Sequence, residues 1–211
     1  MSLTLTEVSF AFPGRPGLIE SVSLTLHPGE SAALMAPSGA GKTTLLEITG
    51  GLRSPDAGSV QFAGRDIGSD AVRVAWVRQG TDLLRRRSVE DNVALPLLAA
   101  GQGRETALRA AREELAQVGL RECWSRQVKD ISGGEAQRTA IARVAVAPPH
   151  ILLADEPTAS LDRDNAQLVA RALARRFPNA IVLIATHDPA VARTAQRLLT
   201  LSDGHILEAA Q

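Results

Sequence analysis

The chain has 211 residues, of which 45% are hydrophobic and 22% charged, ordinary values for a globular protein with a substantial core. Lys and Arg total 23, as do Asp and Glu, so a general nucleic-acid binder, which is usually basic, is not expected. No apolar run approaches the roughly 18–20 residues that span a bilayer, and the single Cys123 excludes an internal disulfide framework. We therefore expect one domain over residues 1–211 in a reducing cytoplasm, with no nucleic acid as partner.

The N-terminal segment predicts antiparallel strands. Apolar residues alternate with polar ones over residues 3–8 and 22–26, which indicates an edge strand and a half-buried strand joined by a turn over residues 13–17. Phe10 fits strand packing. Phe12 is the better candidate for a ring laid against a flat ligand.

Residues 31–46 predict a strand, a glycine-containing loop and a helix, the arrangement of a phosphate-binding loop. Gly39 and Gly41 allow backbone N–H groups to turn inward, and the helix N-terminus adds partial positive charge. Lys42 supplies a cation for the outer phosphates, and Thr43 supplies a hydroxyl for Mg²⁺. The predicted nucleotide-binding residues of this loop are Ala36, Pro37, Ser38, Gly39, Ala40, Gly41, Lys42, Thr43 and Thr44.

Ala36 stands where the pattern G-x-x-x-x-G-K-[ST] has its first glycine. Either alanine is tolerated at a strand end, or the nucleotide site is weakened or inactive. We favour tolerance, because Pro37 biases the preceding residue toward extended backbone with negative φ.

After strands at 59–62 and 72–77, residues 88–147 predict an inserted helical lobe, with an interruption at residues 95–97. Gln79 follows the second strand; its amide is able to reach Mg²⁺ or water, or is simply solvated. Ser132, Gly133 and Gly134 open a helix and provide a second anion site with a hydroxyl and several N–H groups.

Two apolar strands, at 151–154 and 181–185, are of the parallel-sheet kind, and their carboxyl ends are where open α/β sheets place ligands. Asp155 is the candidate Mg²⁺ ligand at the first end, and Glu156 would orient or deprotonate the attacking water. A salt-bridged acidic pair is the simpler alternative, but two acids on a buried strand are costly without a cation. His187, at the second end, is either a packed histidine or a sensor of the γ-phosphate.

Taken together, these motifs resemble the ATP-binding subunit of an ABC transporter over essentially the whole chain. Residues 36–44 resemble its Walker A loop, 151–156 its Walker B strand with the catalytic glutamate, and 159–162 its D-loop, with Ser160 and Asp162. Residues 131–135, ending in Glu135, resemble the signature as I-S-G-G-E. Gln79, His187 and Phe12 match the Q-loop, the switch histidine and the adenine-stacking position.

The resemblance implies a phosphate-loop NTPase core with a mainly parallel sheet, an N-terminal antiparallel β subdomain and the helical lobe. It implies an ATPase that uses ATP and Mg²⁺ and powers a transporter through ATP-driven dimerisation, with the signature of one subunit facing the ATP of the other. The second ATPase subunit would be the same chain or a different one. Separate permease subunits would hold the protein peripherally on the inner face of the cell membrane.

Within the family, residues 89–97 and the run S-G-G-E-A-Q-R resemble a bacterial branch that serves lipoprotein release, macrolide export or cell-division signalling. Two alternatives remain: a non-transport ATPase working on DNA or ribosomes, and a regulatory module that holds ATP with little hydrolysis. The first usually has two cassettes or a long coiled-coil insert, and Glu156 and His187 argue against the second.

Overall fold

The computed structural model describes residues 1–208, and of Arg15 and Pro16 it describes only the backbone. The chain forms two compact units. Unit 1 comprises Met1–Trp76, His150–Glu156 and Pro178–Gln211, and unit 2 comprises Val77–Pro149 and Pro157–Phe177. None of the helices in the described part of the chain is both long enough and apolar enough to cross a membrane.

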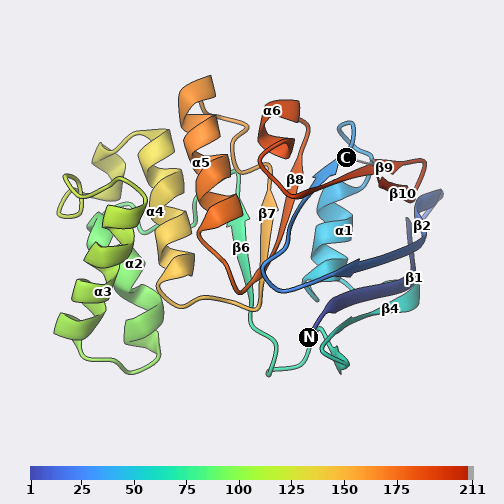
Figure 1. Ribbon diagram of the computed structural model, residues 1–211, viewed down its shortest axis with the longest axis horizontal. Helices are drawn as coiled ribbons and strands as arrows, with labels where there is room; N and C mark the ends of the chain where they lie inside the picture. The colour runs from blue at the N-terminus through green and yellow to red at the C-terminus, as the bar shows by residue number, and fades with distance from the viewer. Residues whose placement is uncertain (209–211) are drawn as a thin grey trace. The chain divides into compact units, whose positions relative to one another are not determined.

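Unit 1 contains an antiparallel sheet in the order β2-β1-β4-β5, as expected for the N-terminal segment (Figure 1). Its strands are β1 (Leu3–Phe12), β2 (Arg15–Leu26), β4 (Ala57–Phe62) and β5 (Arg65–Asp66). The expectation that the first strand is an edge strand is wrong, because β1 pairs with β2 on one side and β4 on the other. Alternating burial shows which face of a strand is covered, but it does not show how many neighbours the strand has.

A second, six-stranded sheet has the order β10-β9-β3-β8-β7-β6. In the pairings described, β3 runs parallel to both β8 and β9, and β7 runs parallel to β8. Among them, only the C-terminal hairpin of β9 and β10 is antiparallel. This confirms the mainly parallel core. The six strands are β3 (Ser31–Met35), β6 (Val74–Arg78), β7 (Ile151–Asp155), β8 (Ile181–Thr186), β9 (Arg197–Ser202) and β10 (His205–Glu208).

The helix α1 (Lys42–Thr49) lies against the strands of this sheet, where Leu45, Leu46 and Ile48 are at most 1% exposed. Gly50 ends α1 at a point of close approach: a Cβ there would lie 2.7 Å from both Leu153 Cδ1 and Trp76 Cζ2. A short helix, α6 (Pro189–Ala192), follows β8 and begins with Pro189, and Asp188 caps it.

Unit 2 is built from helices that pack side by side (Figure 1). They are α2 (Val89–Ala99), α3 (Arg104–Gln117), the 3₁₀ turn η1 (Val128–Asp130), α4 (Gly133–Ala145) and α5 (Arg163–Arg175). Ser88 caps α2 by accepting a hydrogen bond from the Asp91 N–H at 3.1 Å. The expected interruption is wrong, because Pro96 lies inside α2: packing against α3 and α4 offsets the loss of one main-chain donor.

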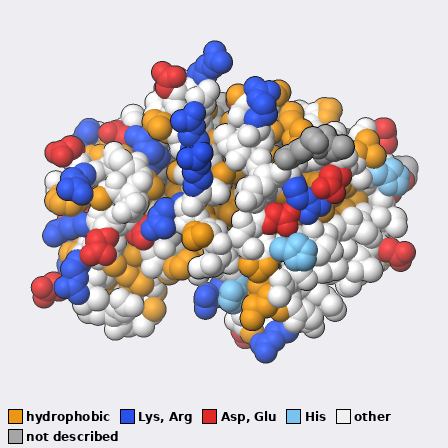
Figure 2. Space-filling model, viewed as in Figure 1, with side chains coloured by type: hydrophobic (Ala, Val, Ile, Leu, Met, Phe, Trp, Pro, Cys, Tyr) orange, Lys and Arg blue, Asp and Glu red, His pale blue; other side chains and the backbone are white. Residues whose placement is uncertain are grey.

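Charge is distributed unevenly between the two units. Unit 2 has 16 Lys and Arg residues against 11 Asp and Glu, a formal net charge of +5. Unit 1 has 7 Lys and Arg against 12 Asp and Glu, a net charge of −5. Basic side chains gather over the exposed face of α5 in Figure 2. The neutral chain is therefore the sum of an acidic unit and a basic one.

The close approach at Gly50 generates a stability prediction. Replacing Gly50 with Ala forces Leu153 or Trp76 to move, and overpacking of this kind costs about 1–3 kcal/mol of the free energy of unfolding. Urea denaturation followed by circular dichroism measures the loss. Gly80→Ala is the matched control, because Gly80 is exposed and has no heavy atom within 4 Å of its would-be Cβ. Equal stability of the two variants would show that α1 is not held as closely as the structure indicates.

Candidate nucleotide-binding site

The phosphate loop connects β3 to α1, and its backbone requires glycine at two positions. Gly39 and Gly41 have φ of 80° and 99°, in the region that side-chain-bearing residues avoid. At Gly41, a Cβ would also lie 3.1 Å from Leu18 Cγ and 3.2 Å from Ile19 Cδ1. The loop can therefore keep its curvature and its contact with β2 only with glycine at this position.

Ala36 does not require glycine. It is absent from the described non-glycine residues with positive φ, and it is 7% exposed at the end of β3. The expectation of negative φ before Pro37 is therefore confirmed, and the methyl group imposes no backbone strain.

Lys42 is held within the loop by main-chain oxygens. Its side chain is 8% exposed, and Nζ donates to the carbonyl of Ala36 at 2.7 Å and to that of Pro37 at 3.2 Å. Glu156 Oε1 lies 3.6 Å from the same nitrogen. Since an ammonium group has three N–H donors, the two carbonyls fix its position and leave it one further donor.

Thr43 and Asp155 meet although they are 112 residues apart: the Thr43 hydroxyl donates to Asp155 Oδ2 at 2.9 Å. Hydroxyl and carboxylate oxygens are the ligands that Mg²⁺ prefers, and the ion usually keeps several waters and substrate oxygens. In the described part of the chain, no group of three or more His, Cys, Asp and Glu side chains forms a metal cage. The donor set fits a magnesium ion that shares its coordination with phosphate and water.

Glu156 follows β7 in a left-handed backbone conformation, with φ of 45°. Its N–H donates to the carbonyl of Ala185 at 2.9 Å, which ties this backbone to β8. Both of its carboxylate oxygens lie 3.0 Å from His187 Nδ1, and the side chains are 20% and 65% exposed. Left-handed geometry costs a glutamate of order 1–3 kcal/mol, so the surrounding structure determines where this carboxylate lies.

Phe12 and the phosphate loop line one cavity of about 540 Å³ in unit 1. The Phe12 side chain is 39% exposed, so one part of the ring is open to a ligand. Three groups predicted to act on a nucleotide therefore face the same space: an aromatic ring, a cation and a carboxylate. The cavity is lined by Phe12, Gly17, Leu18, Ser38, Gly39, Gly41, Lys42, Thr43, Thr44 and Glu156.

In unit 2, Ser132 caps α4 through a reciprocal pair of hydrogen bonds with Glu135. The Ser132 hydroxyl accepts from the Glu135 N–H at 3.2 Å, and Glu135 Oε2 accepts from the Ser132 N–H at 2.7 Å. The hydrogen bond from the Ser132 backbone lowers the pKa of Glu135, so this carboxylate stays ionised at neutral pH. Glu135 therefore orders the start of α4, a role that the sequence analysis did not assign.

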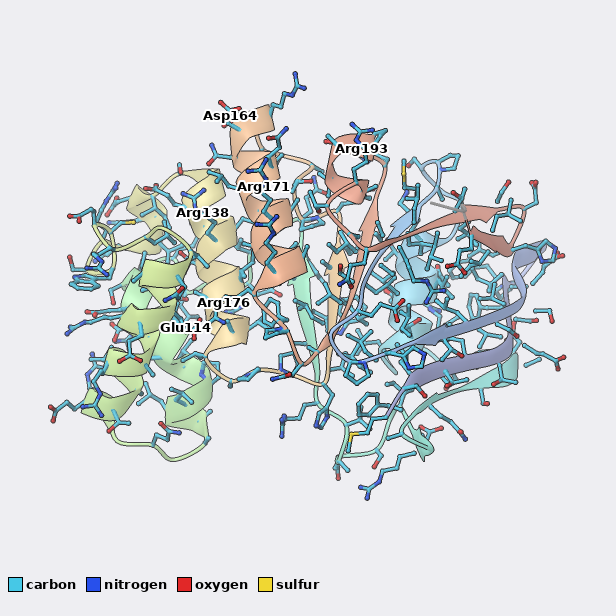
Figure 3. The ribbon with its side chains drawn as sticks, viewed as in Figure 1. Glu114, Arg138, Asp164, Arg171, Arg176 and Arg193 are labelled. Atoms are coloured by element: carbon cyan, nitrogen blue, oxygen red, sulfur yellow. The ribbon has the colours of Figure 1, made fainter. Side chains whose placement is uncertain are left out.

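Asn165 is a second residue that the sequence analysis missed. It donates from its side-chain amide to Asp162 Oδ2 at 2.7 Å and accepts from Arg138 Nη1 at 3.0 Å. A Cβ on Gly134 would lie 2.5 Å from Asn165 Oδ1, so the signature helix and α5 approach too closely for any other residue. Asp162 itself caps α5, where its side chain accepts from the Asn165 N–H at 3.0 Å. Arg138, which reaches Asn165 from α4, is labelled in Figure 3.

Gln79 lies directly after β6 and is exposed, and the residue before it is anchored. Gln137, which is 2% exposed, donates from Nε2 to the carbonyl of Arg78 at 2.9 Å. Gln137 is thus a third missed residue, and it ties the segment of Gln79 to α4.

Among the predicted site residues, eight of unit 1 line one cavity: Phe12, Ser38, Gly39, Gly41, Lys42, Thr43, Thr44 and Glu156. Asp155 and His187 do not line it, but they contact Thr43 and Glu156, which do. Gln79, Ser132–Glu135, Ser160 and Asp162 belong to unit 2.

Comparison with known proteins places these motifs in one family. A family model described as ABC transporter matches residues 19–159. The lipoprotein-releasing system ATP-binding protein LolD 1 of Rhodospirillum rubrum is 40% identical over 99% of this chain and 98% of its own length. LolD of Granulibacter bethesdensis is 42% identical over 91% and 89%. These names agree with the bacterial branch inferred from the sequence.

Among solved structures, the dimeric post-hydrolysis state of the ATP-binding cassette MJ0796, bound to ADP and Pi, aligns with a TM-score of 0.82 at 29% identity. The alignment covers 98% of this chain and 97% of that chain. The structure of cbiO1 from Clostridium perfringens has a TM-score of 0.86 at 22% identity, over 97% and 86% of the two chains, and shares the fold.

The backbone of the phosphate loop predicts opposite results at two positions. Ala36→Gly should leave nucleotide affinity within about threefold, because φ at Ala36 is not positive and glycine relieves no strain. Gly41→Ala should weaken affinity at least about tenfold, because φ is 99° and Leu18 and Ile19 block the methyl group. Titration with a fluorescent ATP analogue measures both. A large gain for Ala36→Gly would mean that the natural loop is impaired.

Proposed function

The chain belongs to the ABC transporter family, and on this premise we propose how its residues bind and hydrolyse ATP. It is an ATP-binding and ATP-hydrolysing subunit that powers a membrane transporter. The observation that carries the residue assignment is the convergence of Phe12, Lys42 and Glu156 on one cavity of unit 1. End-to-end similarity to transporter subunits leaves no reason to prefer the non-transport ATPase or the non-hydrolysing module.

In our proposal, the triphosphate lies along the phosphate loop and the start of α1. Gly39 and Gly41 turn N–H groups toward the phosphates, and Lys42 donates to the outer phosphate oxygens from a position fixed by two carbonyls. The adenine stacks on Phe12, whose ring lines the same cavity. Base and phosphates are thus recognised by different groups within unit 1.

Thr43 and Asp155 would hold Mg²⁺, Thr43 directly and Asp155 directly or through water. When bound, the ion neutralises charge on the phosphate oxygens. The Thr43–Asp155 hydrogen bond supports this assignment, because it holds the two oxygens 2.9 Å apart, close enough for both to bind one ion.

Glu156 is the general base of the proposed reaction. Its carboxylate accepts a proton from the water that attacks the γ-phosphorus, the bond to the β–γ bridging oxygen breaks, and ADP leaves. His187 Nδ1, 3.0 Å from both carboxylate oxygens, orients the base. The other ring nitrogen of His187 is then available to the terminal phosphate, which supports its assignment as the γ-phosphate sensor.

We propose that the signature and D-loop residues of unit 2 contact the nucleotide bound by a second copy of the ATPase. Ser132, Gly133, Gly134 and Glu135 at the start of α4 would face the ATP held by Lys42 of the partner subunit, and Ser160 and Asp162 would lie at the same interface. Support comes from the dimeric cassette at 29% identity that holds ADP and Pi. ATP joins the two subunits in this arrangement, and hydrolysis releases them. The second copy would be the same chain or a homologous one.

The membrane partners in our proposal are permease subunits of the lipoprotein-releasing kind, because curated relatives at 40% and 42% identity are lipoprotein-releasing system ATP-binding proteins. The ATPase would then lie on the inner face of the cell membrane. Copurification of the tagged chain from detergent-solubilised membranes, followed by identification of any permease bound to it, tests that partner.

Glu156→Gln should retain ATP binding and reduce steady-state hydrolysis by at least about 10²-fold, because the amide cannot accept the proton from water. Phosphate release and calorimetric ATP binding measure the two effects. Glu7→Gln is a closely matched control: Glu7 also has left-handed backbone, with φ of 47°, but lies exposed on β1. Near-normal turnover of Glu156→Gln would remove Glu156 from this role.

Saturating Mg-ATP should convert the Glu156→Gln protein from monomer to dimer in light scattering, because each ATP needs groups from two subunits. Adding Gly133→Asp should prevent the dimer, since the new carboxylate repels phosphate while its Cβ meets Leu161 Cδ2 at an ordinary 3.6 Å.

Gly103→Asp is the control for the added charge, because Gly103 caps α3 and no heavy atom lies within 4 Å of its would-be Cβ. Dimers that form equally well with Gly133→Asp would contradict the placement of the signature at the second nucleotide.

A further inference from the structure

Arg53 lies against the aromatic ring that we assign to adenine. Its guanidinium carbon is 5.3 Å from the centroid of the Phe12 ring and 5.0 Å from that of Phe10. The two rings meet edge to face, with centroids 5.1 Å apart and planes at 89°. One cation therefore contacts both aromatic rings at the end of β1, within the range where ring quadrupoles attract it.

Arg53 is held by Glu47 through both its side chain and its backbone. Its Nε donates to Glu47 Oε2 on α1 at 2.9 Å, and its main-chain N–H donates to the main-chain carbonyl of Glu47. Three residues further on, Asp56 Oδ2 accepts from the N–H of Ala11 at 2.8 Å, next to Phe12. The segment of Arg53 is thus connected both to the helix that begins with Lys42 and to the strand that ends with Phe12.

Phe12 and Arg53 line different hollows, although they contact each other. Phe12 lines the cavity of about 540 Å³ with the phosphate loop, and Arg53 is not among the residues that line it. Arg53 instead lines a separate hollow of about 220 Å³, together with Pro55 and Gly58. A nucleotide in the larger cavity would meet the ring of Phe12 and not the guanidinium, so any effect of Arg53 on the base passes through the ring.

We propose that Arg53 is a positioning residue for adenine recognition, holding the ring of Phe12 against the base while Glu47 connects this contact to the phosphate-binding helix. The inference rests on the proposed function, since it takes Phe12 as the stacking residue. A phenylalanine has no hydroxyl through which a hydrogen bond could fix its orientation, so ring contacts must do so. A cation over the ring also draws on its electron density, which favours stacking of an electron-rich base on the same ring.

The test compares ATP with inorganic triphosphate, which lacks the base, by calorimetry on the full chain. Arg53→Met keeps the apolar stem and removes the charge. It should raise the Kd for ATP three- to tenfold, about 0.7–1.4 kcal/mol, and leave that for triphosphate within twofold. Arg53→Lys should recover part of the loss, and Glu47→Gln should weaken ATP in the same direction by less, because the amide still accepts from Nε.

Two further variants make the result decisive. Arg193→Ala removes an exposed arginine at the end of α6, labelled in Figure 3, and should leave both affinities within twofold. Phe12→Ala should weaken ATP about tenfold and triphosphate hardly at all, and adding Arg53→Met to it should cost nothing more.

Each contrary result has a distinct meaning. If Phe12→Ala changes neither affinity, the proposed adenine site is wrong. If Phe12→Ala weakens ATP and Arg53→Met does not, stacking stands and the role of Arg53 is overturned. Equal weakening of ATP and triphosphate by Arg53→Met would mean a merely structural role, and tighter ATP binding would mean that the guanidinium obstructs the ring; either result overturns the inference.

Discussion

The parallel register of β3, β8 and β7 determines where the groups of the unit 1 site lie. Met35 pairs with Thr186, and Asp155 pairs with Ala185, so the three strands end within one residue of one another. The phosphate loop, Glu156 and His187 follow these three ends. A slip of β7 by one residue would turn Asp155 to the other face of the sheet and separate it from the Thr43 hydroxyl.

Features that depend on local chemistry could be predicted from the sequence. The apolar run at 151–154 predicts a buried parallel strand, and Ser132 with its two glycines predicts a helix start. Both predictions were right because the relevant energies come from neighbouring residues: burial of a continuous apolar run, and N–H groups satisfied by a serine at the helix start.

The remainder depends on contacts between segments distant in the sequence. Nothing near Asn165 indicates its contact with Arg138, because Arg138 lies 27 residues earlier in the chain, on α4. Arg53 has no motif, and its contact with Phe12 exists only once α1 and β1 are folded. The left-handed backbone of Glu156 is imposed by β8 and the sheet edge, whereas an isolated glutamate would avoid it.

The uneven charge of the two units gives each chain an electric asymmetry in spite of its zero formal net charge. Two copies attract each other when the acidic unit of one faces the basic unit of the other, because the facing net charges are opposite. They repel each other when units of the same charge face each other. In the proposed head-to-tail dimer, this attraction would orient the two copies before any nucleotide contact forms, over distances of about 8 Å at physiological salt. Ionic strength would then set how fast the two copies associate, while bound ATP would set how long they stay together.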